Sequence, residues 1–488
     1  MRRRQVYIAG IAGAALAVAQ SAVAQQGVDA AQLQRIDRLN ELERLRRDTR
    51  LRVNQDVPPG QRLFVDYGLY FTASYLTVED AAGDTHVLRE YEFLPYARLN
   101  YDGVHEVFVR LKNGYRDFND GDSFDGRGDE PIDGDLDRGY YRFDLNRYRS
   151  AYGGEAPPYR FTFQAGRDLA YWANGLVLAQ TLDGVTITVG NDWFDLGLLA
   201  GVTPTRTVDI DTSRPNFDHN TRRGFYGAML TANLGDHRPF VYGLIQRDYN
   251  EDDFRQVSFI ATDYEYNSYY FGAGSAGTLG ERVRYAVEAA YEIGRSKSNS
   301  FSLDGFGIFP VEQTDDHIHA VALDAKLDYF LADVRQTRVS FELIAATGDD
   351  DRGSTSNTFN GNLVSTDDNA FNAFGLLNTG LAFGPEVSNV FVTRLGIATI
   401  PMPEVTAFRR MQVGADFFAL WKFSDDAPID EATADHHFLG IEPDVYLNWQ
   451  ITSDITLALR YGVFFPNKDN FASDDSRQLF FGGLTFAL

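Results

Sequence analysis

The chain has 488 residues, a formal net charge of -24 and no cysteine. The absence of cysteine excludes disulfides, thiolate metal sites and cysteine nucleophiles, and the strongly acidic composition argues against a nucleic-acid partner. Aromatic residues make up 14% of the chain, yet the mean hydropathy is only -0.30. This combination favours a transmembrane β-barrel, because aromatic residues gather at both membrane interfaces while half of each strand faces water.

The N-terminus has the pattern of a secretion signal. Arg2, Arg3 and Arg4 precede an apolar stretch over 8–18, and Ala22-Val23-Ala24 supplies small residues for cleavage. We therefore expect a signal peptide over 1–24 and a mature chain that begins near Gln25. Export of this kind, together with a barrel, predicts the outer membrane of a Gram-negative-type bacterium.

Residues 29–53 predict a charged helix. Leu33, Ile36 and Leu39 begin an apolar series that repeats every three residues, and Pro58, Pro59 and Gly60 end the segment. Two interpretations remain open, a solvated periplasmic helix or a short helix that docks to a partner or a second copy. The expected organisation is a periplasmic N-terminal segment over 25–60 and one outer-membrane β-barrel over 61–488.

The barrel segment predicts an all-β fold of about eighteen strands with a two-residue period. The candidate strands are 62–79, 86–101, 104–116, 137–149, 159–167, 175–182, 184–191, 221–234, 237–248, 260–276, 281–294, 313–330, 334–347, 388–400, 406–423, 436–451, 454–466 and 476–488. Their connections alternate between tight turns, such as Asp102-Gly103, Asp183 and Gly235-Asp236, and long loops, such as 192–220, 295–312 and 348–387. Short periplasmic turns and long extracellular loops are typical of outer-membrane barrels.

The end of the chain shows the alternation most clearly. Ile455, Leu457 and Leu459 occupy one face of a strand, while Arg460 lies on the other. A chain that ends on an amphipathic strand predicts pairing of the last strand with the first, because hydrocarbon tolerates no unpaired sheet edge.

Residues 117–137 form an acidic loop with nine carboxylates and one arginine. Hard cations bind carboxylate oxygens, so the loop permits calcium binding. The closing glutamate of a complete EF-hand loop is missing, so a solvated acidic loop is the simpler interpretation. No other cofactor and no catalytic residue is predicted; His317 and His319 share one strand face, but no third metal ligand accompanies them.

Side chains that alternate with the apolar face should point into the lumen. This rule predicts a pore lining rich in arginine, although the chain as a whole is acidic. The candidates are Arg98, Arg110, Arg142, Asp144, Arg394, Arg410, Lys422, Glu442, Asp444 and Arg460.

These arginines allow two interpretations. In the first, they bind an anionic solute such as a uronate-rich polymer, because a ring of arginines selects anions. In the second, Arg98, Arg142 and Arg460 pair with Asp144, Glu442 or Asp444 and only fill and stiffen the barrel.

Scattered segments resemble the alginate export family of outer-membrane porins. Leu94-Pro95-Tyr96-Ala97 is similar to that family's Arg-Pro-Trp-Ala, and Ala165-Gly166-Arg167-Asp168 is similar to its Phe-Gly-Arg-Gln. Further similar segments are Arg142-Phe143-Asp144, Glu386-Val387-Ser388-Asn389-Val390, Ile441-Glu442-Pro443-Asp444 and Leu459-Arg460-Tyr461-Gly462-Val463-Phe464. The resemblance implies an eighteen-stranded barrel with an arginine-lined constriction, and pore roles for Arg142, Arg167 and Arg460. The sequence departs from the family at Leu94, which replaces an arginine, and at Leu488, which replaces an aromatic residue.

The expected function is passage of an anionic, alginate-like exopolysaccharide through an arginine-lined pore, without enzymatic chemistry. Loop 348–387 is the candidate plug or gate. The alternatives are a general porin for small anions or oligosaccharides, and a barrel enzyme or adhesion protein that acts through its acidic loops. Expected partners are the anionic polysaccharide, outer-membrane lipid and lipopolysaccharide, and periplasmic secretion components.

Overall fold

The computed structural model describes residues 57–123, 126–155, 157–250, 254–257, 260–304 and 307–488. The predicted signal peptide over 1–24 and the predicted helix over 29–53 lie outside these residues. Within the described ranges, no helix is long and apolar enough to cross a membrane.

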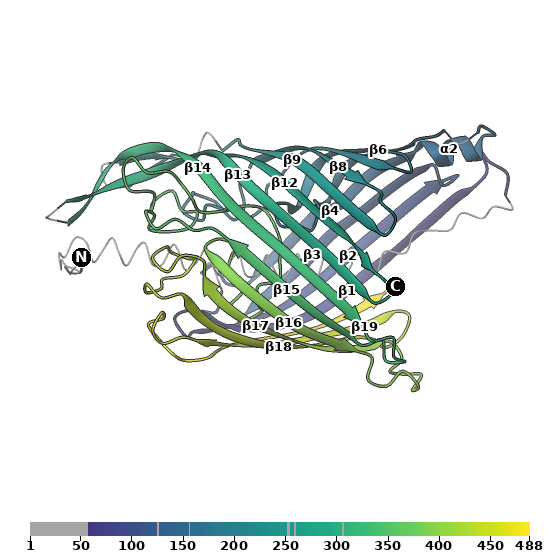
Figure 1. Cartoon of the computed structure of the whole chain (residues 1–488). Helices are drawn as coiled ribbons and strands as arrows, with labels where there is room; N and C mark the ends of the chain where they lie inside the picture. Colours follow the sequence, from purple (N-terminus) through teal and green to yellow (C-terminus); the bar gives the residue numbers. More distant parts are fainter. Residues whose placement is uncertain (1–56, 124–125, 156, 251–253, 258–259, 305–306) are drawn as a thin grey trace.

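The described chain forms one closed, antiparallel sheet of 18 strands, in which each strand pairs with its neighbours in the chain (Figure 1). The strands of the barrel are β1 (Leu63–Glu79), β2 (Thr85–Tyr101), β3 (His105–Phe118), β4 (Glu130–Asp144), β5 (Arg160–Tyr171), β6 (Ala179–Gly190), β7 (Phe194–Val202), β8 (Arg223–Ala232), β9 (His237–Asp248), β12 (Tyr266–Leu279), β13 (Val283–Asp304), β14 (Gly307–Phe330), β15 (Arg338–Ala346), β16 (Val390–Thr399), β17 (Met411–Lys422), β18 (Phe438–Gln450), β19 (Ile455–Pro466) and β20 (Arg477–Ala487). A separate hairpin consists of β10 (Phe254–Val257) and β11 (Ile260–Asp263), and α2 (Leu145–Ala151) follows β4.

The last strand closes the sheet against the first. β1 and β20 pair from Tyr70 with Ala487 to Val78 with Leu479. The backbone N–H groups of Leu69 and Leu488 each donate to the other residue's carbonyl oxygen, at 2.9 and 2.8 Å. Because every barrel strand has two partners, the sheet has no open edge, and the predicted closure of the barrel is confirmed.

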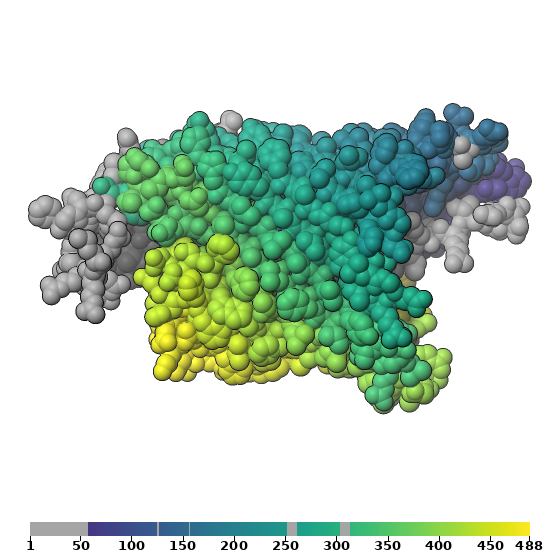
Figure 2. Space-filling view, in the orientation of Figure 1, coloured from purple at the N-terminus to yellow at the C-terminus, as the bar shows by residue number. Residues whose placement is uncertain are grey.

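The two faces of the sheet differ as the period of two predicts. Phe271, Leu395 and Val445 point outward and are about half exposed, whereas Val392 on β16 and Leu420 on β17 point inward and are buried. The outward side chains form the continuous outer wall seen in Figure 2. An apolar outer wall around a sheet without edges is the surface that a bilayer requires.

We call the end of the barrel that holds the C-terminus and α2 the base, and the opposite end the mouth (Figure 1). Most long connections lie at the mouth. There β13 and β14, with 22 and 24 residues, extend beyond the other strands as a hairpin. Most of the loop predicted over 295–312 is therefore strand.

The strand count was predicted correctly only because two errors cancelled. The predicted strands 175–182 and 184–191 correspond to one strand, β6, and β7 lies within the predicted loop 192–220. Asp183-Gly184 has the composition of a turn, but both residues lie inside β6. A Cβ added to Gly184 would lie 2.4 Å from the carbonyl oxygen of Ala200 and 2.6 Å from the Cα of Gly201, so glycine is required there by close backbone approach.

The strand predicted over 137–149 ends at Asp144, where α2 begins. The Asp144 carboxylate accepts a hydrogen bond from the backbone N–H of Arg147 at 3.0 Å, as the N-cap of the helix. Aspartate is a preferred N-cap residue, which explains why the strand gives way to a helix at this point.

Candidate pore lining and loop clamp

Three arginines and two aromatic rings on neighbouring strands form what we call the basic wall: Arg98, Phe108, Arg138, Tyr140 and Arg142. The guanidinium carbon of Arg98 lies 5.1 Å from the ring centre of Phe108, and that of Arg142 lies 5.2 Å from that of Tyr140. Arg138 contacts both rings, at 5.5 and 5.8 Å. Strand alternation on β2, β3 and β4 directs all five side chains inward, so aromatic faces orient the positive charges along the lumen.

Carboxylates and an amide hold the basic wall in place. Arg138 contacts Asp168 at 2.6 Å. Arg142 donates two hydrogen bonds to the side-chain oxygen of Gln164, at 3.0 and 2.9 Å, and lies 3.8 Å from Glu106. The Arg142 side chain is 38% exposed, against 6% for Arg138, which makes Arg142 the more accessible of the two to a solute.

Beside the basic wall the lumen surface is hollowed. Gly166 on β5, Gly184 on β6 and Gly201 on β7 pair in one row that continues from Tyr140 on β4. A cavity of about 220 Å³ lies over this part of the sheet, lined by Gln164, Gly166, Asp168, Leu182, Gly184 and Leu199 among others. The missing side chains leave room next to the arginines for a small molecule.

The wall formed by β14 to β18 is richer in carboxylates. Its inward charged side chains include Asp316, Asp324, Lys326, Asp328, Arg338, Glu342, Arg394, Asp416, Lys422, Glu442 and Asp444. Glu342 forms an ion pair with Arg394, its cross-strand neighbour. In a barrel of eighteen strands, β14 and β15 lie nine strands from β3 and β4, so this end of the carboxylate-rich wall faces the basic wall across the lumen.

The long connection over 347–389 folds into the barrel and is held by what we call the loop clamp: Asp211, Glu292 and Glu442. Glu442 on β18 accepts hydrogen bonds from the backbone N–H groups of Leu381, Ala382 (2.7 Å) and Phe383 (3.0 Å). On β13, Glu292 accepts one from the backbone N–H of Asn372 at 2.9 Å. Wall carboxylates thus satisfy backbone donors that would otherwise be buried without partners.

Aromatic packing and backbone pairing complete the attachment of this loop. The ring of Phe383 stacks on Phe464 of β19 with centres 4.2 Å apart. Phe374 pairs with Leu178, in the connection between β5 and β6. The loop is therefore fixed to several sectors of the barrel, and it crosses the interior between them.

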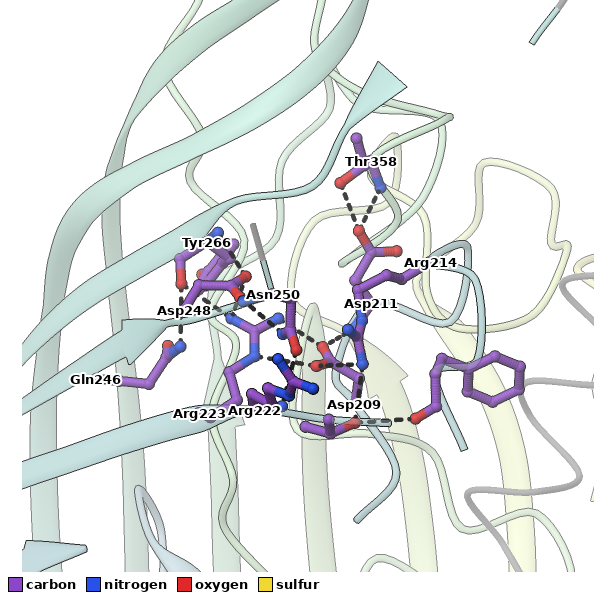
Figure 3. A network of polar contacts seen from close by, with 12 residues as sticks. Asp209, Asp211, Arg214, Arg222, Arg223, Gln246, Asp248, Asn250, Tyr266 and Thr358 are labelled. Atoms are coloured by element: carbon purple, nitrogen blue, oxygen red, sulfur yellow. Dashed lines mark hydrogen bonds and ion pairs between the residues drawn. The ribbon is translucent and has the colours of Figure 1, made fainter. Parts of the chain in front are cut away.

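A buried ionic network ties the loop to the mouth (Figure 3). Arg223 at the start of β8 donates to both carboxylate oxygens of Asp209, at 3.0 and 2.6 Å, and contacts Asp248 at 3.0 Å. Arg214 lies 3.5 Å from the same Asp209. Nearby, Asp211 accepts hydrogen bonds from the backbone N–H and the hydroxyl of Thr358.

The two aspartates of the 203–222 connection respond differently to burial. Burial by itself raises the pKa of Asp209, but the charges of Arg223 and Arg214 outweigh it and hold that pKa below its usual value. Burial, and to a smaller extent the nearby charge of Asp209, raises the pKa of Asp211, although hydrogen bonds from Ser213 and Thr358 act in the opposite direction. Asp209 is therefore a fixed anion, whereas Asp211 holds the loop by hydrogen bonds.

The structure separates the predicted pore residues into groups. Arg98, Arg142 and Arg460 point inward over aromatic rings, with Arg460 lying 5.8 Å from the ring centre of Phe481. Arg110 and Arg394 point inward too, but each forms an ion pair with a carboxylate, Asp137 and Glu342 respectively. Asp444 is inward and buried.

Other predicted residues have positions that suit support better than solute contact. Lys422 donates to the carbonyl oxygens of Asp425 and Ala434 at the mouth, at 3.0 and 2.8 Å. Glu442 holds the loop, and Asp144 caps α2. Arg410 lies exposed at the base, where it donates to Gln450 at 3.2 Å.

The position of Arg167 contradicts the pore role that the family resemblance implied. Asp168 points inward to Arg138, so its neighbour Arg167 points outward. There Arg167 donates two hydrogen bonds of 2.6 Å to Asp183, its cross-strand partner on β6. The segment Ala165-Gly166-Arg167-Asp168 is similar to the family in its residues, but this similarity did not predict the face of the strand on which Arg167 lies.

The predicted pairing of Arg142 with Asp144, Glu442 or Asp444 is not what holds Arg142, because its contacts are Gln164 and Glu106. Glu106 and Asp168 are the acidic groups beside Arg142 and Arg138. Sequence reasoning missed Arg138, Tyr140 and Asp168, although the outward position of Tyr141 implies inward positions for Tyr140 and Arg142. The hollow was also missed, since it depends on glycines of three strands that only the paired sheet aligns.

No protein-family model and no curated protein matches the chain. Solved structures show the same fold. Pseudomonas aeruginosa OccK11 (OpdR) is 11% identical, with a TM-score of 0.50 over 90% of this chain and 100% of that chain. Pseudomonas aeruginosa OccK8 (OprE) is 10% identical, with a TM-score of 0.51 over 87% and 98%. A structure of Pseudomonas aeruginosa OpdK with vanillate has the same identity, TM-score and coverage.

These comparisons establish the fold, a closed barrel like that of the OccK outer-membrane porins. They do not confirm the resemblance to the alginate export family. At this level of identity the likeness carries no information about cargo, which has to be argued from the lumen itself.

Proposed function

We propose that the chain is a passive outer-membrane channel for small anionic solutes, with Arg142 as the principal contact. The observation that carries this proposal is the exposed guanidinium of Arg142, stacked on Tyr140 and fixed by Gln164, beside the glycine hollow. A planar guanidinium donates to a carboxylate through two parallel hydrogen bonds. The mouth would face the cell exterior, and the base the periplasm.

The inward loop favours small solutes over a polysaccharide. A polymer in transit needs an uninterrupted path, whereas the loop over 347–389 is bound to β13, β18 and the β5–β6 connection. We therefore favour the small-anion channel over export of an alginate-like polymer.

The test is ion selectivity in planar bilayers. Arg142→Gln and Arg167→Gln remove the same charge from opposite faces of the barrel. A charge about 4 Å from a passing ion contributes about 1 kcal/mol in water-like surroundings, so Arg142→Gln should lower the anion-to-cation permeability ratio about twofold to fivefold. Arg167→Gln should leave the ratio unchanged.

If Arg142→Gln and the unaltered protein have the same anion-to-cation permeability ratio, Arg142 does not line the path that ions take. Adding polyuronate to the bilayer chamber tests cargo size. Small carboxylates should permeate, and polyuronate should neither permeate nor be needed for current.

A further inference from the structure

A row of polar side chains crosses the outer wall on four neighbouring strands. We call it the outer basic row: Arg247 on β9, Asn267 on β12, Arg295 on β13 and His317 on β14. Asn267 pairs with Arg295, and Arg295 pairs with His317. Gln246 pairs with Ser268, so the next residue on β9, Arg247, lies opposite Asn267 and continues the row. These strands form the face turned toward the viewer in Figures 1 and 2.

All four side chains point away from the lumen. Their chain neighbours Gln246, Ser268, Ser296 and Ile318 are buried inside the barrel, and strand alternation places the next residues outside. Arg295 is 60% exposed. Arg247 lies 4.4 Å over the ring of Tyr269, an outward residue, and donates to its hydroxyl.

The row lies at the upper limit of the apolar outer wall. Two rows nearer the base, Phe271, Tyr291 and Val321 pair across the same strands and are exposed. Between them and the basic row lies a mixed row that contains Tyr269 and His319. Aromatic side chains mark the level of lipid head groups. On β12 and β13 the basic row lies beyond such side chains toward the mouth, which is the direction in which a bilayer carries its phosphates.

Outward arginines elsewhere on the barrel are arranged differently. Arg89 on β2 and Arg167 on β5 each bind both oxygens of a carboxylate directly across the strand pair, Asp117 and Asp183. In the outer basic row the cross-strand neighbours of Arg295 are Asn267 and His317. Arg295 reaches a carboxylate only diagonally, at Asp315, and Arg247 contacts the ring and hydroxyl of Tyr269. The two arginines of the row thus share one carboxylate contact, where Arg89 and Arg167 have one each.

Acidic groups near the row lie farther from the membrane. Arg295 contacts Asp315 at 3.0 Å, and Lys297 lies 3.2 Å from Asp263 and 3.8 Å from Glu265. These residues belong to positions beyond the basic row toward the mouth, since Lys297 pairs with Asp315. The order from the membrane outward is thus aromatic, basic, then mixed acidic and basic.

We propose that the outer basic row binds the phosphate groups of the anionic glycolipid of the outer leaflet, the lipopolysaccharide class. Neighbouring strands are about 4.8 Å apart, so the row spans about 14 Å, enough for two phosphates on one head group. Arginine binds phosphate oxygens through its paired donors. The aromatic and aliphatic side chains below the row contact the acyl chains of the same molecule. The proposal depends on the membrane position of the barrel and not on its ion selectivity.

The test compares two double variants of the full barrel in neutral detergent. Arg247→Gln with Arg295→Gln should weaken binding of diphosphorylated lipid A about tenfold, as measured by native mass spectrometry. Arg89→Gln with Arg167→Gln removes two outward charges from other sectors and should leave this binding unchanged. Ion selectivity in bilayers should be the same for both, which separates this proposal from the channel function.

Lipid chemistry provides a second measurement that needs no variant. The unaltered protein should bind diphosphorylated lipid A at least tenfold more tightly than dephosphorylated lipid A, and inorganic phosphate at the same concentration should not displace it. Equal binding of the two lipids, displacement by inorganic phosphate, or equal losses in the two double variants would overturn the proposal. If the first double variant fails to fold, Arg247→Lys with Arg295→Lys keeps the charges, and loss of the lipid preference there would contradict a role for positive charge.

Discussion

The basic wall and the loop clamp both place charged side chains inside the barrel, yet they use them differently. In the basic wall, Arg142 is held by an amide and an aromatic ring and stays partly exposed. In the loop clamp, Glu442 is fully buried and its oxygens are occupied by backbone N–H groups. An inward charge therefore does not by itself identify a solute site; its partners and exposure do.

A substitution in the ionic network of Arg223, Asp209 and Asp248 should have the largest effect on the stability of the protein. Arg223→Ala leaves Asp209 and Asp248 buried without their shared cation, and breaking a buried ion pair costs about 3–5 kcal/mol. We expect a clear fall in the midpoint of thermal unfolding in detergent. Arg222→Ala, the neighbouring position in the chain, is the matched control, and an equal fall there would contradict this assignment.

Loss of the Glu442 carboxylate should release part of the inward loop. Glu442→Ala removes the acceptor for three backbone N–H groups, with an expected cost of about 2–3 kcal/mol. Single-channel conductance should rise and fluctuate more. Glu442→Gln keeps one oxygen acceptor and should have a smaller effect, so identical conductance in both variants and in the unaltered protein would show that the loop does not limit current.

The stability of the mouth should depend on pH between about 4.5 and about 8 through Glu386. Burial first, and then the nearby charge of Asp430, raises the pKa of Glu386 to about 8. An acid whose pKa is raised in the folded state binds more protons when folded, so stability falls as the pH rises from about 4.5 to about 8. Glu386→Gln should flatten this part of the profile of unfolding midpoint against pH. An unchanged slope would mean that other groups cause the dependence.

The smallest expected effect is that of a change at Asp168, which lines the hollow beside the basic wall. Asp168→Asn keeps the shape of the side chain but removes the negative charge that accompanies Arg138. The anion-to-cation permeability ratio should rise, by less than Arg142→Gln lowers it, because the Asp168 side chain is only 19% exposed. A fall in the ratio would show that Asp168 positions the arginines and does not oppose them.

Sequence alternation predicted much of the lumen and little of its chemistry. It placed Arg98, Arg142 and Arg460 on the inward face, as the structure does. It could not tell Arg142 from Arg110, since both alternate with apolar residues and only the folded sheet places Asp137 against Arg110. The resemblance in Ala165-Gly166-Arg167-Asp168 failed for a related reason, because a match in composition does not fix which face an arginine occupies.

The sequence by itself determined that this chain is a barrel and which side chains alternate, because a side-chain period of two is a local property of the strand. Tertiary structure alone decided the strand borders around Gly184, the inward path of loop 347–389 and the partner of each buried charge. These features arise from backbone contacts between strands and loops far apart in the chain, such as Glu442 with Ala382 and Asp211 with Thr358. Burial makes such pairings energetically decisive, and no local pattern specifies them.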